Sequence, residues 1–196
     1  MKRFIILTLG LAMIYGANAQ ENKLEIKPSG RILLDGGLFK ANEQDDKFND
    51  GFAIPDMRVG FGASYGEWKA KVDMGYAYGK VNMKDVFIQY NFDKDCNDFL
   101  RAGYFIHQFG LQSSTSSSFK ISMEEPASNQ AFNNSRMIGL MYQHTRKKFL
   151  GTVSFFTESD AMKMTSDKLG NQGVGMMSRL VYKPLCEPGR IFHVGF

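Results

Sequence analysis

Charged side chains recur at every second position in several segments of this chain. In residues 67–78, Lys69, Lys71 and Asp73 alternate with apolar side chains. Alternate side chains of a β-strand point to opposite faces, so this spacing predicts one charged face. The same alternation elsewhere gives the full set of candidate charged positions: Arg31, Arg58, Lys69, Lys71, Asp73, Arg101 and Arg179, with Lys120 in a polar connection. Along a water-filled path, such charges would select ions by their sign.

The guanidinium groups in this set have the planar donor geometry that phosphate prefers. Acidic side chains share the predicted faces and would offset the positive charge: Asp35, Asp56, Glu67, Asp73 and Asp85. The pattern therefore has two interpretations. Either the charges line an anion path, or they form a lattice of ion pairs that supports a protein wall.

Residues for catalysis or metal binding are not grouped in the sequence. His107, His144 and His193 fall in three separate segments, and His107 comes shortly before the serine-rich stretch 112–118. A Ser–His hydrolase is conceivable on that basis, but we interpret His107 as a histidine that faces the lumen or stands at the end of a strand. The sequence has neither a glycine-rich phosphate loop nor metal-ligand spacing. We therefore expect no enzymatic activity, no cofactor and no metal site.

The N-terminal segment 1–19 is predicted to be a secretory signal peptide. It has a positively charged start, a short apolar run at 4–15 and an Ala-Asn-Ala cleavage pattern at 17–19. The apolar run is shorter than the roughly 20 residues that a membrane-spanning helix needs. We therefore expect residues 20–196 to be exported as the mature chain.

Composition narrows the remaining possibilities. The formal net charge is only +4 and the basic residues are not clustered, so we expect no nucleic-acid partner. With 20 Gly, 13% aromatic residues and only 5 Pro, the composition suits an all-β protein. An exported chain can form a disulfide, but Cys96 and Cys186 are far apart in sequence and their pairing stays open.

Alternating segments along the mature chain predict nine antiparallel strands in a meander. The predicted strands are 29–38, 54–65, 67–78, 84–91, 99–107, 136–144, 149–156, 173–183 and 191–196. Long connections at 39–53, 108–135 and 157–172 would all fall at one end of the sheet. Outer-membrane barrels have this arrangement, with short periplasmic turns and long external loops.

Two kinds of barrel could use this alternation. A membrane barrel turns its apolar face toward lipid, whereas a secreted lipocalin-like barrel turns it inward around a small apolar ligand. Aromatic side chains near strand ends, among them Trp68 and Tyr76, favour the membrane, because such rings prefer the lipid–water interface. The long connection 108–135 does not suit a lipocalin, and it would either narrow a channel or stay outside it.

The strand count predicts an incomplete barrel. Bacterial single-chain barrels use even numbers of strands, and an eight-stranded barrel is filled by its own side chains. We therefore interpret residues 20–196 as the N-terminal part of a single, larger barrel domain.

Several of these segments, in their order, resemble the phosphate-selective porin O/P family. The resemblance rests on the stretches 30–35, 57–62, 84–90, 100–105, 123–126 and 136–139, and it covers most of residues 29–157. It implies a sixteen-stranded transmembrane β-barrel, of which this chain is about half, in a homotrimer in the outer membrane. It also implies passive diffusion of small hydrophilic solutes, with outer-membrane lipid and small anions such as phosphate as partners. The stretch 105–109 lacks the Lys and Pro that family members often carry there, so the degree of phosphate selectivity stays open.

Overall fold

The computed structural model describes residues 23–38, 50–77, 79–95, 97–108, 136–157, 173–187 and 190–196. The predicted signal peptide 1–19, Lys120, Cys96 and nearly all of the connection 108–135 lie outside these residues. Within them, no helix is long and apolar enough to cross a membrane.

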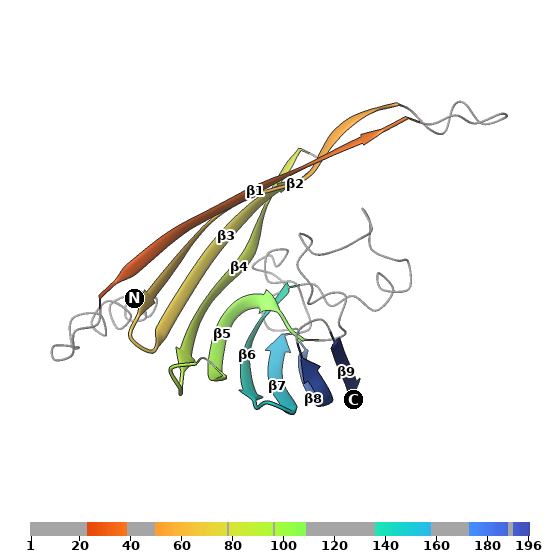
Figure 1. Cartoon of the computed structure of the whole chain (residues 1–196). Helices are drawn as coiled ribbons and strands as arrows, with labels where there is room; N and C mark the ends of the chain where they lie inside the picture. The colour runs from red at the N-terminus through yellow and green to blue at the C-terminus, as the bar shows by residue number, and fades with distance from the viewer. Residues whose placement is uncertain are drawn as a thin grey trace.

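All nine predicted strands are present, and they form one antiparallel sheet in chain order (Figure 1). The strands are β1 (Glu25–Gly37), β2 (Gly51–Tyr65), β3 (Trp68–Ala77), β4 (Lys80–Asn91), β5 (Asp98–Ile106), β6 (Arg136–Thr145), β7 (Phe149–Thr157), β8 (Val174–Glu187) and β9 (Arg190–Gly195). The prediction of an all-β antiparallel meander is therefore confirmed. The sheet is open, with β1 and β9 at its two edges.

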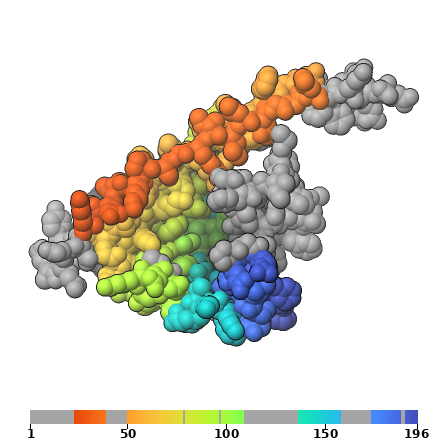
Figure 2. Space-filling model, viewed as in Figure 1, coloured from red at the N-terminus to blue at the C-terminus, as the bar shows by residue number. Residues whose placement is uncertain are grey.

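The sheet curves strongly, so that it forms a trough rather than a flat layer (Figure 1). In the space-filling view, the inner surfaces of the middle strands are visible between the orange edge of β1 and the blue edge of β8 and β9 (Figure 2). This is the shape of part of a barrel wall, because a closed barrel needs the same curvature continued around its axis.

The turns that join β2 to β3, β4 to β5, β6 to β7 and β8 to β9 lie together at one end of the sheet, whereas the short turn from Ala77 to Lys80, between β3 and β4, lies at the opposite end. Gly66, with φ of 57°, allows the tight connection between β2 and β3. Backbone hydrogen bonds in both directions join Arg146 and Phe149, with N–O distances of 2.7 and 3.2 Å, and close the turn between β6 and β7. Since all neighbouring strands are antiparallel, the connections 39–49, 109–135 and 158–172 leave and enter the sheet at the opposite end.

The turn between β4 and β5 is held by Asp93. Its carboxylate accepts hydrogen bonds from the backbone N–H groups of Asn97 and Asp98 at 2.8 and 3.1 Å, and from the Asn97 side chain at 3.1 Å. Partial desolvation of Asp93 opposes ionisation, but these hydrogen bonds outweigh it and hold the pKa of the carboxyl below its usual value.

The two faces of the sheet are inverted relative to a soluble protein. Strand register places large, exposed apolar side chains on one face, for example Ile32, Phe61, Val72, Ile88, Leu100, Leu140, Val153, Leu180 and Val194. The opposite face is polar and more buried, and on it Asp73 is 7% exposed and Ser154 only 3%. Side chains crowd on the inside of a curved sheet, so the polar face is the concave one. Soluble proteins bury apolar residues and expose charged ones, which is the reverse of this arrangement.

A small apolar cluster also lies on the concave face. Phe99, Phe105 and Met141 are each no more than 6% exposed, and Phe87 packs against them. The cluster belongs to β4, β5 and β6, and it separates the charged part of the wall near β1 from the Ser and Thr side chains of β7.

Three irregularities interrupt the strand register. Two lie where Pro55 in β2 and Pro184 in β8 interrupt the pairing, since proline has no N–H to donate. The third is a bulge in β4, at which Lys84 and Asp85 together oppose Asp73. Strict alternation would have placed Lys84 on the apolar face, whereas the bulge turns both neighbours toward the concave face.

Candidate solute path

The concave face carries a continuous set of charged side chains across five strands. We call this set the charge belt, and its members are Arg31, Asp56, Arg58, Lys71, Asp73, Lys84, Asp85 and Arg136. It contains five basic and three acidic residues, so positive charge exceeds negative charge by two.

Asp56 on β2 is the centre of the first part of the belt. Its carboxylate is 2.8 Å from Nη2 of Arg31 on β1 and 2.8 Å from Nε of Arg58 on β2. The Nζ atom of Lys84 on β4 lies 3.8 Å away from Asp56 Oδ1. One carboxylate is therefore shared by three basic groups, and it cannot neutralise all of them.

Lys71 on β3 is the centre of the second part. Its Nζ atom lies 2.6 Å from Asp73 and 3.9 Å from Asp85, and Nε of Arg136 donates to Asp85 at 2.7 Å. The side chain of Arg136, from the start of β6, thus extends the belt past β5. These contacts form an ion-pair lattice with a positive surplus, as the second of the two sequence interpretations predicts, whereas the anion path stays a prediction.

Arg101 on β5 is held differently, by an aromatic ring and an amide. The centre of its guanidinium lies 4.1 Å from the Phe87 ring centroid. Its Nε and Nη2 atoms donate to Oε1 of Gln89 at 2.9 and 2.7 Å. Gln89 in turn donates to Asn91 at 2.6 Å, and Asn91 donates to the backbone oxygen of Glu67 at 2.9 Å. The guanidinium is therefore fixed in place by contacts within the wall.

A hollow of about 470 Å³ lies beside Arg101, toward the end of the sheet that carries the turn between β2 and β3. Lys69 and Lys71 of β3 line it together with Arg101, Gln89 and Ser64. Lys27 also lines the hollow, but it pairs with Glu25 at 2.9 Å. Lys69, Lys71 and Arg101 thus give the hollow a surplus of positive charge.

The structure brings together most of the residues singled out from the sequence. Arg31, Arg58, Lys71 and Asp73 belong to the charge belt, and Lys69 and Arg101 line the hollow. On β8, Arg179 pairs in register with the buried Thr152, which places it on the same concave face, away from the belt. Lys120 lies outside the described residues.

Sequence reasoning missed Lys84 and Arg136. The available signal for Lys84 was a pair of adjacent charges, Lys84 and Asp85, inside an otherwise alternating strand, because this pattern is typical of a bulge. Arg136 stands at the very start of a strand, where alternation gives no guide to the direction of a long side chain.

His107, His144 and Cys186 are not members of the charge belt. His107 lies between the rings of Phe105 and Phe156, with centroids at 4.4 and 4.8 Å, and its Nε2 is 3.3 Å from the backbone oxygen of Met137. His144 pairs with Asp98 at 2.8 Å near a short turn. The serine-rich stretch lies outside the described residues, and within the described ones no group of three metal-ligating side chains occurs. Cys186 is an exposed free thiol.

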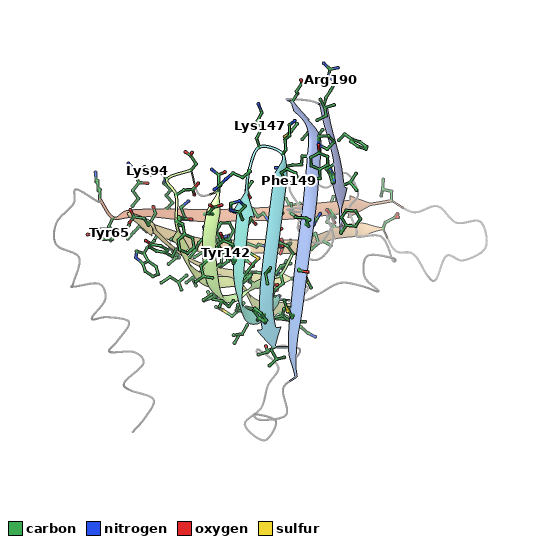
Figure 3. All side chains as sticks on the ribbon, turned by 90° about the horizontal axis from the view of Figure 1, so that it is seen from below. Tyr65, Lys94, Tyr142, Lys147, Phe149 and Arg190 are labelled. Carbon is green, nitrogen blue, oxygen red and sulfur yellow. The ribbon has the colours of Figure 1, made fainter. Side chains whose placement is uncertain are left out.

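Aromatic side chains form a band on the apolar face near the short turns. The rings of Trp68, Tyr90, Phe92 and Tyr142 follow one another with centroid distances of 5.0, 5.2 and 6.1 Å. Phe149 and Tyr182 continue the band on β7 and β8, at 5.0 Å. In Figure 3, Lys94, Lys147 and Arg190 mark the tips of the turns, and Tyr142 and Phe149 lie further along the strands. This is the arrangement of an interfacial aromatic girdle.

Comparison with known families agrees with this geometry. A family model described as phosphate-selective porin O and P matches residues 26–196, which include every strand of the sheet except the first residue of β1. No curated protein matches the chain. The resemblance inferred from the sequence is confirmed.

Proposed function

The chain belongs to the phosphate-selective porin O and P family, a family of channels rather than enzymes, and we propose that it forms part of the wall of a passive outer-membrane pore for small hydrophilic solutes. The observation that carries this proposal is the inversion of the two faces: exposed apolar side chains outside and a positively biased charge belt inside. A lipocalin-like carrier would need the apolar face inside, which is opposite to the arrangement found.

Strand dimensions support contact of the apolar face with lipid. Trp68 and Tyr76 are eight residues apart on β3, which corresponds to about 26 Å at roughly 3.3 Å per residue. A strand tilt of about 40° reduces this to about 20 Å across the membrane, close to the roughly 25 Å apolar band of outer-membrane barrels. In this proposal residues 1–19 direct export, the complete barrel assembles as a trimer, and the segment 108–135 narrows the channel.

We propose a weak to moderate preference for anions. The charge belt has a surplus of positive charge, and at the hollow Lys69 and Arg101 lie beside its member Lys71. Asp56, Asp73 and Asp85 hold the preference down, because each pairs with basic neighbours. Phosphate and other small anions would therefore pass without tight binding.

The test is the reversal potential of the full-length porin in planar bilayers under a salt gradient. Wild type should prefer anions, and combined replacement Lys69→Glu, Lys71→Glu and Arg101→Glu should shift the reversal potential toward cations. The shift should be larger at low salt, because the Debye length falls from about 30 Å at 0.01 M to about 3 Å at 1 M. Unchanged selectivity in the triple variant would show that these residues do not line the path.

A further inference from the structure

One ion pair of the charge belt passes over a whole strand. Lys84 is on β4 and Asp56 is on β2, and β3 lies between them. The Lys84 side chain crosses β3 at Gly75, where a Cβ atom would collide with Lys84 Cε, lie 2.9 Å from Asn82 Oδ1 and come within 3.2 Å of Lys84 Cγ. The crossing therefore depends on position 75 being a glycine, which has no side chain to block it.

A second glycine, Gly60, leaves room for the side chain of Asp73. Gly60 on β2 is the register partner of Asp73 on β3, and a Cβ at position 60 would collide with Asp73 Oδ1 and lie 2.9 Å from its Cγ. Asp73 consequently lies flat on the wall, 7% exposed. Its Oδ1 atom is buried and, among the described residues, accepts no hydrogen bond, whereas Oδ2 is 2.6 Å from Lys71.

We propose that Gly60 and Gly75 are positioning residues that set the charge selectivity of the pore. They keep one acidic and one basic side chain of the belt pressed against the wall, so that neither presents its full charge to passing ions. The inference rests on the proposed pore function, but the positions of Asp73 and Lys84 are features of the wall itself.

A methyl group at either position would move a charge without changing the net charge of the protein. Gly60→Ala displaces the Asp73 carboxylate toward the channel, where its Oδ1 atom can be hydrated. Gly75→Ala displaces the Lys84 ammonium in the same direction, because the crossing to Asp56 is blocked. The two substitutions add the same bulk, yet they expose charges of opposite sign.

The experiment measures the anion-to-cation permeability ratio of the full-length porin in planar bilayers at low salt. Gly60→Ala should lower the ratio and Gly75→Ala should raise it, each by about twofold for one unit charge moved to roughly 8 Å from the ion path. Gly62→Ala is the matched control, since a Cβ there meets only the backbone oxygen of Lys27, at 3.8 Å. Equal behaviour of all three variants, or shifts of Gly60→Ala and Gly75→Ala in the same direction, would overturn the proposal.

A second measurement separates this proposal from the pore function. The Lys84 side chain is 16% exposed, so a water-soluble amine reagent should modify it slowly in wild type and several times faster in Gly75→Ala, as read by mass spectrometry of the peptide. This readout does not require conduction. An unchanged rate overturns the role of Gly75 even if the pore is anion-selective, whereas a faster rate in a protein without anion preference refutes only the proposed function. If Gly75→Ala fails to insert, the permeability ratio of Gly60→Ala against Gly62→Ala decides the proposal.

Discussion

Individual charges on the concave face differ in how firmly their neighbours fix them. Arg101 is held by a ring beneath it and by two hydrogen bonds to one amide oxygen. Among the residues that the structure describes, Lys71 is held by the attraction of Asp73 and Asp85. A fixed guanidinium loses little conformational freedom when a solute passes, whereas a lysine can follow the solute along the wall. In the proposed pore, we therefore expect the two types of cation to act differently at the same hollow.

Arg101→Lys tests the importance of this fixed geometry. The substitution keeps the charge but removes the planar fork that bonds Gln89 and stacks on Phe87, so we expect the protein to lose about 1–3 kcal/mol of stability. The loss should appear as a lower temperature for conversion of the heat-modifiable form on gels, with anion preference retained. Arg179→Lys is the control, because no hydrogen bond or ring contact of Arg179 is found in the described part of the chain. Equal conversion temperatures for the two variants would contradict the prediction.

At the scale of the strand, the alternation of polar and apolar residues predicted far more of the structure than the chemistry of single residues could. It gave the nine strands, their antiparallel order and the face on which Arg31, Arg58 and Lys71 lie. It failed at Lys84, because a bulge shifts the alternation between the residues before it and the residues after it, and the position of the bulge depends on pairing with β3. The partners within the belt were also not predictable. An ion pair such as Lys84 with Asp56 joins strands that are not neighbours, so it follows from curvature and from Gly75 rather than from local sequence.

Adjacent residues on β3 offer a direct test of which face contacts lipid. Val72→Cys should be protected from a water-soluble thiol reagent in the membrane, and Lys71→Cys should be labelled quickly, because their side chains point to opposite faces. Val72→Lys should lower the stability of the folded protein in the membrane by about 2–4 kcal/mol if the position lies near the bilayer midplane. Both cysteine variants are made in a chain with Cys96 and Cys186 replaced by Ser. Fast labelling at position 72 with protection at 71 would reverse the assignment of the faces.

For the whole molecule, the number of strands limits how the sheet can close. Each strand is antiparallel to the next, so in a sheet of nine the edge strands β1 and β9 run in the same direction. Direct pairing of β1 with β9, within one chain or between two copies in the same membrane orientation, would be parallel. An antiparallel closure needs an odd number of further strands, as the even strand counts of bacterial barrels require. Unpaired edge groups are costly in lipid, where no water satisfies them.

We therefore expect residues 20–196 alone to form no stable conducting barrel. When refolded in detergent and added to planar bilayers, this segment should give no steady conductance steps and no heat-modifiable migration on gels, and its open edges should drive aggregation. The full-length porin, refolded in parallel, is the control for the procedure. Steady, uniform conductance steps from the purified segment would show that β1 and β9 do close the wall, and that a parallel pair is tolerated in this barrel.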